Sequence, residues 1–231
     1  MFKLPFIRAS LLLVALVGLR AEFTPGVVVA HANQSAAAGQ VSGDEAIRRT
    51  WLIIEQVIRD SYPELKGADI QIKTFNSDAD YFRTIFSFGR FASGRKMRYV
   101  IKVNPRVFEL AAPEDGIRAI LAHELGHVYD FHRQKRIRLL GLARLATKGY
   151  TARFERWTDL QAIARGYGEG LKAYRRWLYQ HIPPNRVAEK RRDYFSPEEI
   201  DAIEAKRRQN PGVMAYWFKH VPLSLQEIEA R

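Results

Sequence analysis

The pentapeptide His123-Glu124-Leu125-Gly126-His127 has the residue types and spacing of a metal-dependent hydrolase site. Its two histidines are four residues apart, so on a helix both imidazoles project from one face and can bind a single zinc ion. Glu124 lies beside them and can reach a zinc-bound water without ligating the metal. Zinc lowers the pKa of such a water toward ~7, and a carboxylate can take its proton as it attacks a carbonyl. The motif therefore predicts zinc-dependent hydrolysis with Glu124 as general base.

A catalytic zinc ion also needs a third protein ligand and an open position for water. The chain has no cysteine, so this ligand must be a histidine or a carboxylate. His132 follows the motif but faces away from the histidine pair on a helix, where it suits a position near the helix C-terminus. Glu155 and Asp159 are better placed, because they are four residues apart on a later helical pattern. We expect Glu155 to complete the site and Asp159 to accept the ring N–H of one ligating histidine.

An E-x-x-x-D sequence downstream of H-E-x-x-H resembles the gluzincins, the thermolysin-like clan of zinc metallopeptidases. The resemblance extends from a strand expected at 95–104 to the end of a helix expected at 151–165. It implies one zinc ion per chain held by His123, His127 and Glu155, with Glu124 as general base and Asp159 behind the ligands. Aspzincins, which use an aspartate as third ligand, are the alternative, with Asp159 then replacing Glu155.

The same resemblance implies how substrate is bound and how the transition state is stabilised. In these peptidases the strand before the active-site helix is a sheet edge that takes the substrate backbone as an added strand, and 95–104 stands in that place. Its residues Arg98 and Lys102 would favour acidic substrates or protect the edge from aggregation. An oxyanion needs a tyrosine or histidine donor. Tyr167, Tyr194 and His220 lie downstream, and we expect Tyr194 to be the catalytic residue among them.

Capping signals and hydrophobic spacing set out the elements that must position these residues. Alternating apolar residues predict strands over 69–76 and 95–104, whereas 78–91 is aromatic and ambiguous. Helical patterns cover 44–60, 113–131, 135–147, 151–165, 169–181 and 196–208, and a last helix starts near 224. This order predicts an α+β, helix-dominated fold, a zincin-like metallopeptidase core with a small antiparallel sheet and an active-site helix that carries the H-E-x-x-H motif.

The N-terminus has the parts of a secretory signal peptide over residues 1–32. Lys3 and Arg8 precede an apolar stretch that ends at Leu19, and Ala30 and Ala32 form a cleavage site of the A-x-A type. An uncleaved membrane anchor is the alternative. We expect a periplasmic or secreted protein in which residues 33–43 are a flexible lead-in and residues 44–231 form one zinc metallopeptidase-like domain.

Composition restricts the class of protein and its partners. The chain has 231 residues, 47% of them hydrophobic, and a formal net charge of +12. Such a sequence is unlike disordered or multi-span membrane proteins, and its charge favours an anionic partner such as a membrane surface or a cell-wall polymer. The basic, apolar stretch at 135–145 is an ordinary core helix or an element that binds anionic lipid. Nucleic acid is not expected, because no aromatic platform or recognised module is present.

Three functions are compatible with these patterns. The first is an exported zinc metallopeptidase that cuts peptide or protein substrates. The second is a non-catalytic, basic envelope-binding protein whose zinc site is structural or vestigial. Glu124 argues against the second, since a structural site needs no carboxylate beside its first ligand. The third is a zinc hydrolase that acts on cell-wall peptides, which the sequence does not separate from the first.

Overall fold

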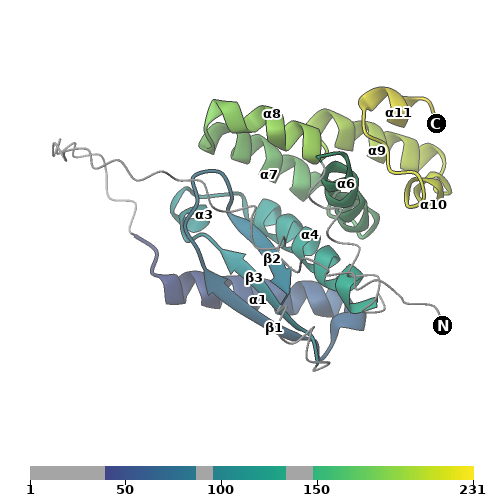
Figure 1. The fold of residues 1–231 in the computed structure, drawn as a ribbon. Coiled ribbons are helices and arrows are strands. Elements are labelled where there is room, and N and C mark those ends of the chain that lie inside the picture. The colour runs from purple at the N-terminus through teal and green to yellow at the C-terminus, as the bar shows by residue number, and fades with distance from the viewer. Residues whose placement is uncertain (1–39, 87–95, 134–147) are drawn as a thin grey trace, which may run out of the picture.

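The structure is a computed structural model that describes residues 40–86, 96–133 and 148–231 (Figure 1). The expected signal peptide, most of the lead-in and the expected helix at 135–147 lie outside the described residues. Within the described ranges, no helix is long and apolar enough to cross a membrane. The described elements form an α+β fold dominated by helices, as the sequence predicts.

The first helix, α1 (Gly43–Ser61), begins where its capping signal places it. Ser42 is the N-cap, and its side chain accepts a hydrogen bond from the backbone N–H of Glu45. The helix directs Ile54 and Val57, both fully buried, into the core. A short 3-10 turn, η1 (Pro63–Leu65), follows it and leads into the sheet.

The sheet has three strands: β1 (Asp69–Thr74), β2 (Phe82–Phe86) and β3 (Arg98–Val103). Their order is β1-β3-β2, with β1 parallel and β2 antiparallel to β3. The sheet is therefore mixed, and the expectation of an antiparallel sheet is wrong. The expectation that 95–104 is an edge strand is also wrong, because β3 is hydrogen-bonded to β1 along one edge and to β2 along the other. Strand β2 is formed by part of the ambiguous segment 78–91.

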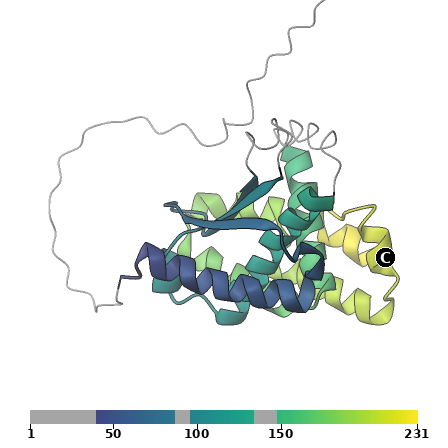
Figure 2. The same cartoon turned by 90° about the horizontal axis from the view of Figure 1, so that it is seen from below.

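One face of the sheet is packed and the other carries no described helix. Tyr99, Ile101 and Val103 alternate along β3 and are buried against the helices. From β2, the hydroxyl of Thr84 donates a hydrogen bond to the carbonyl of Glu124, 3.3 Å away. Figures 1 and 2 show α1 (Gly43–Ser61) and α4 (Glu114–Arg133) on this packed side.

Helix α4 is the centre of the molecule, with every residue from Ala119 to Val128 buried. It begins after Pro113, with acidic residues in its first turn that interact favourably with the helix dipole. Two helices approach its other side closely, α6 (Lys148–Ala164) and α7 (Gly168–His181). A Cβ on Gly170 of α7 would lie only 2.7 Å from the Cβ of Ala119, so this crossing requires glycine.

The C-terminal helices form the upper layer in Figure 1 together with α6 and α7. The short α3 (Arg106–Glu109) precedes α4, and the C-terminal part contains α8 (Pro184–Asp193), α9 (Pro197–Gln209), α10 (Val213–Trp217) and α11 (Leu225–Glu229). Buried Arg156 of α6 holds this layer together. Its guanidinium donates to the Glu199 carboxylate at 2.7 Å and to the carbonyls of Arg191 and Arg192.

Candidate metal centre and cleft

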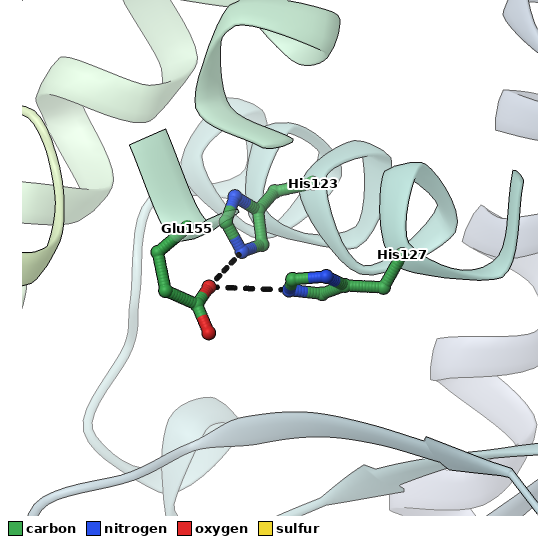
Figure 3. Close-up of side chains that lie close together, drawn as sticks. All are labelled: His123, His127 and Glu155. Carbon is green, nitrogen blue, oxygen red and sulfur yellow. Dashed lines mark hydrogen bonds and ion pairs between the residues drawn. The ribbon is translucent and has the colours of Figure 1, made fainter. Parts of the chain in front are cut away.

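Three side chains from two helices converge on one point between α4 and α6 (Figure 3). The Nε2 atoms of His123 and His127 each lie 3.2 Å from Oε2 of Glu155. Two ligands on a tetrahedral zinc ion at 2.0–2.1 Å are separated by about 3.3 Å. The possible ligand atoms of these three side chains all lie within 4.8 Å of one another. The donor set and its spacing fit a zinc ion.

Asp159 lies on the other side of His123, away from the converging nitrogens. Its Oδ1 accepts a hydrogen bond from Nδ1 of His123 at 2.8 Å, which directs Nε2 toward Glu155. The same carboxylate accepts hydrogen bonds from Arg175 of α7 at 3.1 Å and from the backbone N–H of Phe195 at 3.0 Å. With its oxygens used in this way, Asp159 is not one of the three clustered side chains.

Thr158 performs a similar task for His127, and the sequence did not single it out. Its hydroxyl lies 3.3 Å from Nδ1 of His127 and donates a hydrogen bond to the carbonyl of Phe154 at 2.9 Å. The hydroxyl can therefore accept from the Nδ1–H of His127, which leaves Nε2 directed toward Glu155. The signal available in the sequence was its position three residues after Glu155, on the same side of the helix.

Burial and neighbouring groups shift the pKa values of Glu155, His123 and Asp159 in opposite directions, and the neighbouring groups prevail. Burial alone would raise the pKa of Glu155, but His127 and His123 lower it far below its ordinary value. Burial would lower the pKa of His123, yet Asp159 and Glu155 outweigh it and raise this pKa to about 9. Burial alone would raise the pKa of Asp159, but Arg175 and His123 outweigh it and lower this pKa below its ordinary value. The two carboxylates are therefore ionised at neutral pH.

Glu124 faces a cavity beside the cluster. The residue is 5% exposed, and its Oε2 is buried with no hydrogen-bond partner among the described residues. The cavity has a volume of about 30 Å³ and is lined by His123, Glu124, Tyr174, Arg175 and Tyr194, among others. This volume suits a water molecule or two. A buried carboxylate oxygen without a hydrogen-bond partner raises the free energy of the fold, so a polar group bound beside Glu124 would be stabilised.

Of the three oxyanion candidates, the structure brings only Tyr194 to this cavity. Its ring centroid is 5.8 Å from that of His123, and the guanidinium of Arg175 lies 4.5 Å from the same ring centroid. The hydroxyl of Tyr167 is hydrogen-bonded to that of Ser61, and the ring of His220 packs at an angle against Tyr216. Burial raises the pKa of Tyr194 well above its ordinary value, so the hydroxyl stays protonated.

Three further basic side chains lie on α4, α8 and α7. His132 is exposed at the end of α4, with Nδ1 3.4 Å from the hydroxyl of Tyr99. Lys190 is buried at the cavity wall, and its ammonium group donates to the Asp80 carboxylate at 2.6 Å. Arg175 is likewise buried, and its guanidinium pairs with the Asp159 carboxylate.

Comparison with known proteins adds one match. The comparisons with curated proteins and with solved structures find no match. The model of Peptidase family M48 matches residues 73–174, a stretch that runs from the end of β1 into α7. It contains His123, Glu124, His127 and Glu155, with Thr158 and Asp159 behind them. The part of the chain that forms β2, β3, α4 and α6, with the three clustered side chains, is therefore similar to Peptidase family M48.

Proposed function

We propose that this protein is a zinc-dependent metallopeptidase that hydrolyses peptide bonds. The observation that carries the proposal is the placement of Glu124. Glu124 lines the same cavity as His123, has a buried carboxylate oxygen with no partner among the described residues, and directly follows His123 of the cluster with zinc-ligand geometry. The match of residues 73–174 to Peptidase family M48 supports the same reaction class.

His123, His127 and Glu155 would hold the metal, and the hydrogen bonds of Asp159 and Thr158 support this assignment. The three bonds already made by Asp159 favour Glu155 as third ligand, an arrangement of gluzincin type. The aspzincin arrangement would require the Asp159 carboxylate to leave Arg175 and Phe195, at the cost of a buried, unpaired guanidinium.

The bound zinc ion would supply a water of lowered pKa and an electrophile that polarises the scissile carbonyl. Glu124 takes the proton of the attacking water and returns it to the leaving amine, so one carboxylate serves as base and then as acid. The protonated hydroxyl of Tyr194 donates a hydrogen bond to the carbonyl oxygen as negative charge develops on it. Both groups line the one cavity.

An extended substrate would add to β2. The order β1-β3-β2 makes β2 the sheet edge next to α4, and Phe82 at its start lines the cavity. Arg98 and Lys102 belong to the central strand, so they do not select the substrate as residues of an edge strand would. We also propose export, with residues 1–32 as signal peptide and a periplasmic or secreted location, on the sequence pattern alone.

The test compares Glu124→Gln with Glu114→Gln, which changes an exposed glutamate on the same helix. Cleavage of unfolded casein and of cross-linked muropeptides is measured, with zinc content determined by mass spectrometry. We expect Glu124→Gln to retain about one zinc per chain and to lose activity, while Glu114→Gln behaves as the parent protein. Full activity of Glu124→Gln, or an inactive zinc-loaded parent protein, would refute the proposal. Cleavage of muropeptides alone would identify a hydrolase of cell-wall peptides.

A further inference from the structure

The outer face of the sheet, opposite α1 and α4, carries three cations in one row across the strands. Lys73 of β1 lies directly opposite Lys102 of β3, and Lys102 lies directly opposite Arg83 of β2. We call these three residues the cation row. Like charges directly opposite one another destabilise a sheet, so the row has a cost that internal packing does not explain.

Most of the charge in the cation row is left uncompensated by the fold. Lys73 and Lys102 make no ion pair with any residue in the described ranges. Arg83 bonds Asp80 at 2.8 Å, but that carboxylate is shared with Lys190. Protection of sheet edges from aggregation accounts for lysine and arginine on β1 and β2. It does not account for Lys102, which lies on the central strand.

Apolar side chains stand beside the cation row on the same face. Ile85 is 40% exposed and lies opposite Val100, one row further along the strands. The guanidinium of Arg83 covers the ring of Phe75 at 5.4 Å, so this ring is no platform for stacking a nucleic-acid base. Cations that flank an exposed aliphatic side chain match a membrane interface, where lipid phosphates meet the first part of the acyl chains.

We propose that this face docks the protein on an anionic membrane surface. The cation row contacts lipid phosphates, and Ile85 enters the interfacial region. Figure 1 shows the strands in front of α1 and no labelled helix over their near side. The metal cluster lies between α4 and α6, behind the sheet, so docking uses none of its residues. The inference is therefore independent of the proposed peptidase activity.

A probe at a single site tests the docking face in the full-length chain. The protein has no cysteine, so Ile85→Cys can be labelled alone with an environment-sensitive fluorophore, and Ala215→Cys on α10 is the matched exposed control. We expect emission at position 85 to rise and shift to the blue with vesicles that contain phosphatidylglycerol. Pure phosphatidylcholine vesicles should give no response, and added salt should weaken the response to anionic vesicles. An equal response at position 215, or with neutral vesicles, would overturn the proposal.

Charge variants of the labelled protein test the cation row itself. Each lysine near an anionic membrane strengthens binding about fivefold, so Lys73→Gln with Lys102→Gln should weaken binding roughly 25-fold. Arg208→Gln with Lys219→Gln removes the same charge from exposed positions beyond the sheet and should change binding less than about twofold. Both double variants should keep the parent melting temperature, since neither removes an ion pair. Equal losses of vesicle binding in the two double variants would contradict the proposal. A fluorescence response to soluble polyphosphate as large as the response to anionic vesicles would also contradict it, and would identify an acidic polymer as partner.

Discussion

Gly126 of α4 packs directly against the methyl group of Thr158 of α6. A Cβ on Gly126 would lie 2.8 Å from Cγ2 of Thr158, a separation that real Cβ atoms do not adopt. The glycine within the H-E-x-x-H motif therefore sets the distance between the histidines of α4 and Glu155 of α6. Close packing here is a condition for the 3.2 Å separations within the cluster.

We expect Gly126→Ala to destabilise the protein by about 1–3 kcal/mol and to weaken zinc binding, because α6 must move away from α4. Thr158→Ser removes the methyl group that clashes and keeps the hydroxyl that contacts His127. The double variant should therefore recover most of the loss. Denaturant unfolding and zinc titration measure both effects, and a double variant as impaired as Gly126→Ala would show that the contact is not the cause.

Asp159→Asn should lower zinc affinity by about 10–100-fold, because the amide no longer fixes His123 as a carboxylate does. Folding stability should fall as well, since the buried Arg175 loses its anionic partner. Asp201→Asn is the control, because it neutralises a carboxylate that pairs with Lys172 at the surface. Competition with a chromogenic chelator measures the affinity. Parent affinity in Asp159→Asn would remove its proposed orienting role.

Tyr194→Phe should reduce kcat by about 10²-fold with little change in KM, because the hydroxyl is needed only when negative charge develops on the substrate. Tyr179→Phe removes a buried hydroxyl that has no partner among the described residues and should leave kcat unchanged. Steady-state kinetics on one peptide substrate compares the two. A purely structural role for Tyr194 would instead lower stability and leave kcat of the folded fraction intact.

Zinc uptake by the metal-free protein should release a proton. The pKa of His123 is raised from 6.5 to about 9, so its ring is protonated at pH 7 and must lose that proton to bind a metal. The raised pKa also stabilises the metal-free fold below pH 6.5, and this contribution disappears as the pH rises through about 9. Proton NMR of the metal-free protein should show the His123 ring protonated at pH 7 and neutral well above pH 9. Calorimetry at pH 7 in two buffers of different ionisation enthalpy should detect this proton on zinc uptake, in addition to the proton lost by zinc-bound water. A His123 ring that is already neutral at pH 7 would contradict this assignment.

Local signals in the sequence predicted α1, α4, α6, α7 and α9, because caps and hydrophobic spacing act within a few residues, but they missed α3, α8 and α10. The capping box at Ser196 and Glu199 occurs as expected, with both reciprocal hydrogen bonds made. The i, i+4 spacing likewise placed His123 with His127, and Glu155 with Asp159, on common helix faces. The helix geometry alone determines these pairs.

Contacts between distant segments could not be predicted in this way. The pairing of Lys73 with Lys102 and of Lys102 with Arg83 depends on strand order, which no local pattern encodes. Arg175 and Lys190 were missed for a related reason. A basic residue is read as exposed unless its acidic partner is known, and these partners, Asp159 and Asp80, come from other segments of the chain.

The split of the proposed ligands between α4 and α6 makes the metal a cross-link between two layers. His123 and His127 belong to the helix packed on the sheet, whereas Glu155 belongs to the upper helices. Because the metal binds only the folded arrangement, its free concentration becomes a variable in the folding equilibrium. A concentration 100 times the Kd would add about 2.7 kcal/mol to the free energy of unfolding. Scarcity of zinc would thus act on the abundance of the protein as well as on its chemistry.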